Sequence, residues 1–225
     1  MADKTTTQKL GRYSVYGTIA KGTFSRVRYS VAADTGESFA LRIIDRTKIE
    51  EEGLLENLKN EITIMKMLDH RCVVNVKDML ASNNRIFLVL DLMMGGNLRM
   101  KILREGYLNE TESRFYFQQL FCGIEYLHSM GVTHNNLRCE NLLLHPDGTL
   151  KITDFSMSLI LESDMPLGLG GGIGGVSSIV EKVNESGVDE REGVRFHTLH
   201  ERLLALKGSP LYLAPEVSLS ILTWF

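Results

Sequence analysis

Side chains that could act on a phosphate ester or hold a metal ion are gathered in four short segments of this chain. One segment places a single arginine in an apolar run, another carries an arginine among asparagines, and a third begins with an aspartate. Arginine binds phosphate groups, and carboxylate and amide oxygens are ligands that suit Mg²⁺. The histidines and the three cysteines show no paired metal-ligand spacing, which argues against a zinc site. The four segments are Phe39–Asp45, His134–Leu144, Asp154–Ser156 and Gly208–Glu216.

Taken in this order, the four segments resemble the protein kinase catalytic domain, and the resemblance runs from about Tyr13 to Glu216. The chain looks like the calmodulin-dependent and AMP-activated group of serine/threonine kinases, including the calcineurin-B-like-interacting kinases. One segment alone would be weak support, but four in the same order make a chance match remote. The resemblance implies an α+β, bilobal protein-kinase-like fold with a β-rich N-lobe and a helical C-lobe. It also implies ATP and Mg²⁺ as cofactors.

The elements expected around these segments divide into two lobes. One amphipathic helix at 54–68 and several strand-like runs predict an N-lobe over residues 13–92. Met94-Gly95-Gly96 interrupts the pattern, and the C-lobe, residues 93–225, follows it. The predicted strands are 13–20, 26–31, 38–44, 73–80 and 86–92.

The predicted C-lobe contains an activation segment, residues 154–216, that is enlarged by an insert. From about 167 to 187 this insert is rich in glycine and then in charge, so we expect no stable packing there. In the family, further helices follow the position of Glu216. Only residues 217–225 follow it here, so we expect a C-lobe that is incomplete at the C-terminus.

A long helix is expected early in the C-lobe. Asn109 and Glu112 have the spacing of a capping box, and an apolar stripe at helical spacing follows them. Because the expected covering helices are missing, we expect an exposed apolar face around Phe117, Phe121 and Ile124, and a better protected N-lobe. The stripe consists of Phe117, Leu120, Phe121, Ile124 and Leu127.

The resemblance assigns a phosphate-binding loop to Ala20–Val27, where only the middle glycine, Gly22, is present. Glycine lets a backbone approach phosphates closely. Ala20 and Ser25 are small, so two interpretations stay open: a loop that still folds over a nucleotide, or an ordinary β-turn.

The family places a lysine and a glutamate against the phosphates, and the matching residues here are Arg42 and Glu61. Arginine keeps the charge but is bulkier and donates in a fixed fork, so a bidentate pair that fills the phosphate space is expected. We favour a permanent Arg42–Glu61 pair over true phosphate positioning.

The catalytic loop departs furthest from the family pattern. Asn136 stands where the family has its catalytic aspartate, and an uncharged amide has no useful basicity. Arg138 matches a phosphate-contacting lysine and keeps its charge. Asn141 and Asp154 match the family's two magnesium ligands, while Ser156 replaces a glycine and restricts the backbone.

The resemblance also implies an adenine pocket. Val27 and Ala40 would form its roof, Leu143 its floor and Leu90 its back, with the backbone of Asp91–Met93 as the hinge. Simple core packing would explain the same apolar residues. Asn97 replaces an acidic residue that relatives often use near the ribose.

These residues favour a pseudokinase that binds ATP weakly and acts through protein contacts. A poorly active serine/threonine kinase with a protein substrate and a non-functional truncated fragment are the alternatives. The net charge of −3 argues against nucleic acid or an anionic membrane as the main partner. The N-terminus lacks the apolar stretch of a signal peptide, so a cytoplasmic location is expected, with the nucleus as the alternative.

Overall fold

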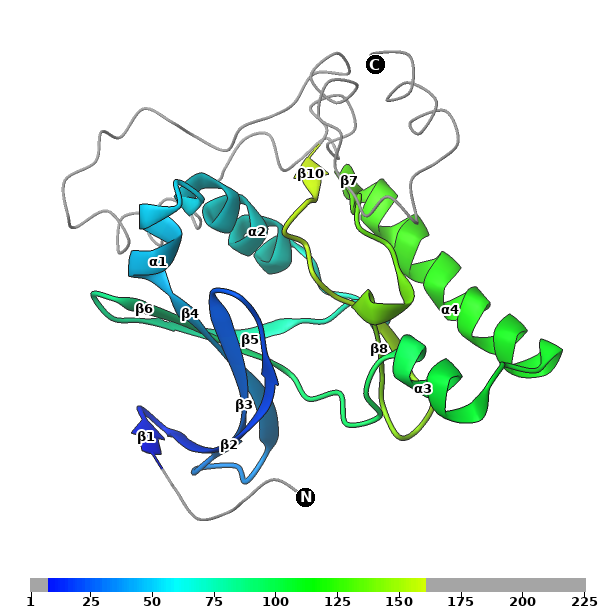
Figure 1. The fold of residues 1–225 in the computed structure, drawn as a ribbon, viewed down its shortest axis with the longest axis horizontal. Helices are drawn as coiled ribbons and strands as arrows, with labels where there is room; N and C mark the ends of the chain where they lie inside the picture. Colours follow the sequence, from blue (N-terminus) through cyan, green and yellow to red (C-terminus); the bar gives the residue numbers. More distant parts are fainter. Residues whose placement is uncertain (1–7, 161–225) are drawn as a thin grey trace.

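The computed structural model describes residues 8–160 of the chain. A six-stranded antiparallel sheet forms the first half, in the order β1-β2-β3-β4-β6-β5 (Figure 1). Its strands confirm the five predicted runs to within a few residues and add β1, a short edge strand. Most of the predicted activation segment, the insert at 167–187 and the segment Gly208–Glu216 lie outside the described residues. The strands are β1 (Gln8–Leu10), β2 (Tyr13–Lys21), β3 (Ser25–Ala32), β4 (Ser38–Asp45), β5 (Val76–Ala81) and β6 (Arg85–Asp91).

Two helices, rather than the single one expected, connect β4 to β5. The predicted helix is α2 (Leu55–Met67), which buries Leu58, Glu61 and Met65 toward the sheet and the second lobe. The helix that was not predicted is α1 (Arg46–Glu51), whose first turn is capped because the Asp45 side chain accepts a hydrogen bond from the Lys48 N–H. Six residues are too few for a helical repeat of apolar positions, so the sequence pattern could not reveal α1.

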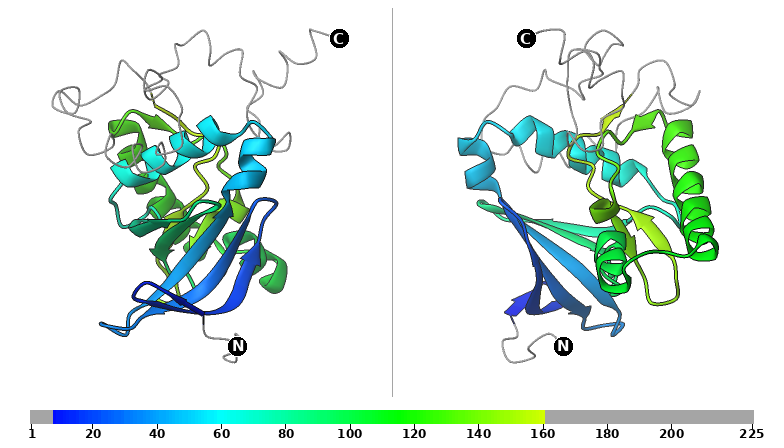
Figure 2. Two further views of the ribbon diagram at one scale, coloured as in Figure 1. Left: turned by 90° about the vertical axis from the view of Figure 1, so that its left-hand side faces the viewer. Right: turned by 45° about the vertical axis from the view of Figure 1, so that its right-hand side comes forward.

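The second half of the described chain is mainly helical, as expected. It consists of α3 (Leu98–Glu105), α4 (Glu110–Ser129), β7 (Val132–Thr133), the short 3₁₀ helix η1 (Cys139–Asn141), β8 (Leu142–Leu144), β9 (Leu150–Ile152) and β10 (Leu159–Ile160). Figure 2 shows the sheet with α1 and α2 on one side of the molecule and α3 and α4 on the other. The capping box is confirmed, since Asn109 Oδ1 accepts from the Glu112 N–H at 2.9 Å and Asn109 Nδ2 donates to Glu112 Oε2 at 2.9 Å.

The buried face of α4 follows part of the predicted stripe. Leu127 is buried and Leu120 and Ile124 pack against the core, whereas Phe117 and Phe121 are 65% and 61% exposed. Helix α4 lies against β9 and Cys72 at Gly123. The absence of a side chain on this glycine permits the close approach. The two phenylalanines share the period of the buried positions, so periodicity alone made the predicted stripe too wide. Ile124 is only partly buried against the core, so the expected exposed face is confirmed for the phenylalanines alone.

Two backbone junctions hold the β8–β9 hairpin, one to residues 72–74 of the N-lobe and one to the glycine segment at the lobe boundary. Around β9, the Val74 N–H donates to the Ile152 carbonyl at 2.9 Å and the Ile152 N–H donates to the Cys72 carbonyl at 2.8 Å. At the glycine segment, the Gly95 N–H donates to the Leu144 carbonyl and the Leu144 N–H donates to the Gly96 carbonyl, both at 2.8 Å. A Cβ on Gly95 would lie 2.7 Å from the Leu144 oxygen, so this approach requires glycine. The largest hydrophobic core runs through both lobes.

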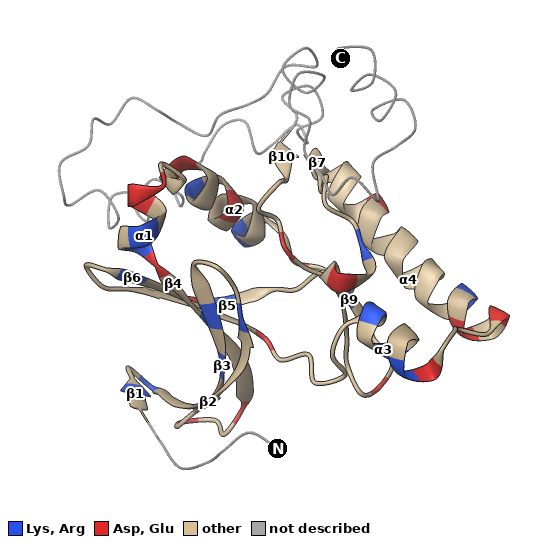
Figure 3. Ribbon diagram, in the orientation of Figure 1, with Lys and Arg blue, Asp and Glu red and all other residues tan. Residues whose placement is uncertain are grey.

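Charged residues are interspersed over the described residues. Figure 3 shows Lys and Arg together with Asp and Glu on α1, α2 and α3, without a continuous face of one sign in that view. None of the helices described between residues 8 and 160 is both long and apolar enough to span a bilayer.

Candidate active site

Asn136, Asn141 and Asp154 form the polar centre between the lobes. η1 carries Asn141, and the segment after β9 carries Asp154. Asn136 Nδ2 and Asn141 Nδ2 donate to the same oxygen, Asp154 Oδ2, at 2.9 and 3.1 Å. Asn141 Nδ2 also donates to the Asn136 carbonyl at 2.8 Å. The structure thus brings together three of the four residues that the sequence assigned to catalysis and to metal binding, and Arg138 is the fourth.

The backbone at this centre adopts conformations that cost free energy. Asp154 has a φ of 70° and Asn135 has a φ of 60°, and both lie in the left-handed region. Such residues cost roughly 1–3 kcal/mol each and persist only where their surroundings fix them. Here Phe155 is fully buried next to Asp154, and Asn135 Nδ2 donates to the Met157 carbonyl at 3.1 Å.

His134 fixes the position of the catalytic loop. Its Nε2 lies 3.0 Å from the Thr153 carbonyl and its Nδ1 accepts from the Asn136 N–H at 3.2 Å, which assigns the proton to Nε2. Its ring packs against Phe155 with centroids 5.1 Å apart. Burial lowers the pKa of His134, against the opposing effects of the Thr153 carbonyl and Asp154. The imidazole therefore stays neutral and joins residues 134–136 to the end of β9.

Arg42 and Glu61 form the bidentate pair expected from the sequence. The two guanidinium nitrogens lie 2.5 and 3.4 Å from the two carboxylate oxygens. The Glu61 side chain is 5% exposed and that of Arg42 is 23% exposed, so Glu61 has little access to water. A carboxylate buried to this degree needs its partner, because an unpaired buried charge is costly. The pair joins β4 to α2. The Arg42 guanidinium is thereby engaged by Glu61.

The predicted phosphate loop forms a tight hairpin turn between β2 and β3. Ala20 pairs with Val27 and Lys21 with Arg26 across the two strands. The Gly22 N–H donates to the Ser25 carbonyl at 2.8 Å and closes the turn. That N–H is used within the turn, so the geometry supports the β-turn interpretation more than a loop that offers its amides to a phosphate.

The predicted adenine-pocket residues are divided between the core and its edge. Ala40 and Leu90 are buried and face each other across β4 and β6. Val27 and Leu143 are partly buried and pack against the same core, and Met93 is half-buried between β6 and α3. The residues therefore lie around one region, although packing explains Ala40 and Leu90 equally well.

Two residues expected near the nucleotide have structural partners. The Asn97 side chain accepts a hydrogen bond from the Met100 N–H at 2.9 Å and so caps α3, a helix that the sequence did not reveal. Asp91 accepts hydrogen bonds from Lys151 Nζ and, at 3.0 Å, from the Asn75 N–H. Burial alone would raise the pKa of Asp91, but these two groups and Lys77 bring it below its ordinary value.

The charged partner of Arg138 is Glu140 rather than the Asp154 carboxylate. Its Nε lies 3.7 Å from Glu140 Oε2, and Arg99 approaches the other oxygen of Glu140 at 2.6 Å. Glu140 therefore lies between two arginines. The negative charge of Glu140, two residues after Arg138, is the signal from which the sequence could have revealed this contact.

Mg²⁺ fits Asn141 better than Asp154. The Asn141 amide nitrogen is held by two acceptors, which turns its oxygen away from them and leaves it available as a ligand. The Asp154 carboxylate already accepts three side-chain hydrogen bonds, including one from Ser156 Oγ. When bound, the ion would neutralise nucleotide phosphates at Asn141 and Asp154. Within residues 8–160, no group of three or more His, Cys, Asp or Glu residues could hold a metal by itself.

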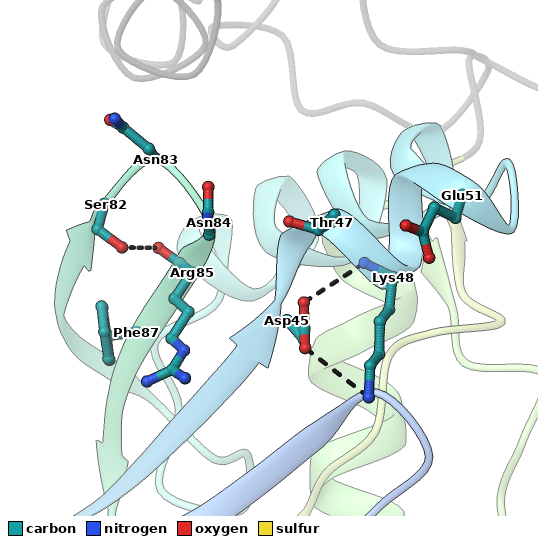
Figure 4. A pocket seen from close by; sticks show the side chains of 9 residues that line it. All are labelled: Asp45, Thr47, Lys48, Glu51, Ser82, Asn83, Asn84, Arg85 and Phe87. Atoms are coloured by element: carbon teal, nitrogen blue, oxygen red, sulfur yellow. Dashed lines mark hydrogen bonds and ion pairs between the residues drawn. The ribbon is translucent and has the colours of Figure 1, made fainter.

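A hollow of about 830 Å³ lies at the far end of the sheet, where α1 meets the turn between β5 and β6 (Figure 4). It contains none of the residues predicted to bind nucleotide, and its walls carry both charges. A search for the active site by cavity shape alone would have placed it in this hollow, away from Asn136, Asn141 and Asp154. Its lining residues are Asp45, Thr47, Lys48, Glu51, Ser82, Asn83, Asn84, Arg85 and Phe87.

The fold and this centre define a protein-kinase-like domain, and the protein kinase domain family matches residues 13–179. The chain therefore belongs to the protein kinase family. Among its curated relatives, CBL-interacting serine/threonine-protein kinase 8 of Arabidopsis thaliana is 43% identical over 160 residues, which cover 71% of this chain and 36% of the relative. CBL-interacting protein kinase 8 of Oryza sativa subsp. japonica is 44% identical over 151 residues, which cover 67% of this chain and 34% of the relative.

A longer match is found with CBL-interacting serine/threonine-protein kinase 3 of Arabidopsis thaliana. It is 39% identical over 210 residues, which cover 93% of this chain and 40% of the relative. The matched part of the chain thus spans about a third to two fifths of the length of these relatives. The chain is similar to the kinase domain of CBL-interacting serine/threonine kinases.

Proposed function

We propose that this chain is a pseudokinase of the serine/threonine kinase type, which binds ATP weakly and acts through contacts with protein partners. The observation that carries the proposal is Asn136. Its side chain stands at the position of the catalytic base and donates a hydrogen bond to Asp154 Oδ2 at 2.9 Å. An amide that donates in this way cannot accept the proton of a substrate hydroxyl, so it cannot act as a general base.

Loss of a positioned base lowers a rate by a factor on the order of 10² to 10⁴. The Arg42–Glu61 pair adds to this loss because it occupies the guanidinium that would otherwise meet phosphate. Weak nucleotide binding is consistent with the closed turn at Gly22, whose N–H is already used. The chain would then signal through binding, in the cytoplasm or nucleus, and the CBL proteins after which its relatives are named are the first partners to test.

A poorly active serine/threonine kinase is the second candidate. It is favoured by the intact pairing of β4 with α2 through Arg42 and Glu61, and by the proximity of Asn141 and Asp154. A kinase of this second kind would bind a protein substrate rather than a signalling partner. It would transfer phosphate to that substrate at a low rate, without a strong base.

A phosphate-transfer assay with radiolabelled ATP and a general protein substrate distinguishes the two. We expect the wild-type rate to equal that of Asp154→Asn, and Asn136→Asp with Arg42→Lys to raise it at least tenfold. Asn135→Asp is the matched control on the same loop, because its amide faces Met157 rather than Asp154. A wild-type rate well above Asp154→Asn that is unchanged by Asn136→Asp would overturn the pseudokinase proposal.

A further inference from the structure

Both oxygens of the Asp154 carboxylate are bound by neutral donors of the chain itself. Ser156 Oγ donates to Oδ1 at 2.8 Å, while the amides of Asn136 and Asn141 donate to Oδ2 at 2.9 and 3.1 Å. Hydrogen bonds to an ionised acceptor are stronger than neutral ones. The carboxylate is therefore well solvated by side chains, without a cation.

The backbone holds this arrangement in place. Asp154 has the left-handed φ of 70°, and Phe155 next to it is fully buried. The Ser158 N–H donates to the Phe155 carbonyl at 3.1 Å, and Ser158 Oγ donates to the His134 carbonyl at 3.0 Å. The segment that carries Ser156 is thus anchored at 155 and 158, and its hydroxyl stays close to Asp154.

The two oxygens of an ionised carboxylate offer about four lone-pair sites, and these donors use three of them, two on Oδ2 and one on Oδ1. A divalent cation would therefore have to displace a donor or take the single site left on Oδ1, beside Ser156. Asn141 can give up its hydrogen bond to Oδ2 and keep the Asn136 carbonyl as acceptor, whereas Ser156 and Asn136 compete with the cation at Oδ1 and Oδ2. A glycine at 156 would carry no such donor.

We propose that Ser156, together with Asn136, holds the Asp154 carboxylate in place of a divalent cation and so lowers the metal affinity of the nucleotide site. Ser156 would affect cation binding through the Asp154 carboxylate. It is therefore a positioning residue and does not touch the reacting atoms. This inference rests on the proposed nucleotide site and deepens it: it states why bound nucleotide gains little from metal.

The experiment compares the affinity of a fluorescent ATP analogue in Mn²⁺ with its affinity in EDTA, for each variant of the full chain. The ratio of the two affinities measures the contribution of the metal, and no phosphate transfer enters it. We expect a wild-type ratio near one and an increase of about fivefold in Ser156→Ala, which corresponds to one ordinary hydrogen bond. Ser156→Thr, which keeps the hydroxyl, should retain the wild-type ratio, and Asn136→Ala should raise it like Ser156→Ala.

A wild-type ratio far above one, or equal ratios in wild type and Ser156→Ala, would overturn the inference. If no variant binds the analogue, the affinity for Mn²⁺ alone is measured by electron paramagnetic resonance instead. Equal Mn²⁺ affinities in wild type and Ser156→Ala would then overturn the inference. An active wild-type enzyme would defeat the pseudokinase proposal but would leave this ratio measurable, so the two failures are distinguishable.

Discussion

His134 makes stability depend on pH. Burial lowers its pKa, so the folded chain keeps it neutral while the unfolded chain binds a proton near pH 6.5. The stabilisation is present above about pH 6.5 and is lost as the pH falls through the lower folded value. We expect the free energy of unfolding, measured with urea, to decrease from pH 7 to pH 5.5.

The contribution of His134 is isolated by His134→Gln, because glutamine can donate to Thr153 and accept from Asn136 without titrating. The pKa of His70 is also lowered, mainly by burial, so the comparison between wild type and variant is needed. His128→Gln, at an exposed position of α4, is the control. The same pH slope in wild type and His134→Gln would contradict this assignment.

At the scale of residues, charge and polarity were predictable, whereas hydrogen-bond partners were not. The pairing of Arg42 with Glu61 followed from the resemblance to the family, which has a lysine and a glutamate at these positions. The direction of the Asn136 amide did not follow from the sequence, because it depends on where Asp154 places its carboxylate. Ser156 was interpreted only as the loss of a flexible glycine, and its hydroxyl became informative once its 2.8 Å contact with Asp154 was known.

At the scale of elements, Gly123 determines how closely α4 lies against β9. A Cβ at this position would lie 2.8 Å from Ile152 Cδ1 and 3.3 Å from Cys72. Gly123→Ala should raise helix propensity by about 1 kcal/mol, but overpacking costs about 1–3 kcal/mol. We expect a net loss of about 1 kcal/mol in the free energy of unfolding, measured by denaturant titration.

Ile152→Val is the matched background, because it removes the methyl group that the new Cβ would meet. The valine alone should cost about 0.5–1.5 kcal/mol. In that background Gly123→Ala should be neutral or stabilising, so the two changes should couple. Equal effects of Gly123→Ala in both backgrounds would show that the contact with Ile152 does not limit the approach.

The predicted elements were those with long, regular patterns. Strands β2, β3, β4 and β6 and helix α2 were found close to their expected bounds, because alternation and helical period are strong signals over seven or more residues. Helix α3 was missed because its exposed Met100 and Leu103 obscure the amphipathic pattern. The stripe of α4 was predicted too wide, because Phe117 and Phe121 share its period, whereas the buried Gly123 has no side chain and carries no hydrophobic signal.

At the scale of the molecule, α4 displays two stacked aromatic rings on its outer face. Phe117 and Phe121 have centroids 6.4 Å apart and are 65% and 61% exposed. Exposed apolar patches promote association. We expect Phe117→Gln with Phe121→Gln to reduce light scattering by the concentrated chain and to leave its circular dichroism unchanged.

Tyr107→Gln provides the control, because Tyr107 is 75% exposed at a position between α3 and α4. It should leave the scattering unchanged if the α4 rings are the cause. If the double variant scatters as much as the wild type, association proceeds through another surface.

The two backbone junctions both end on the β8–β9 hairpin. One joins Ile152 to residues 72–74, and the other joins Leu144 to residues 95–96. Main-chain atoms form all of these hydrogen bonds, so side-chain substitutions leave the bonding groups in place. We therefore expect the hairpin to be displaced together with both segments whenever the arrangement of the lobes changes.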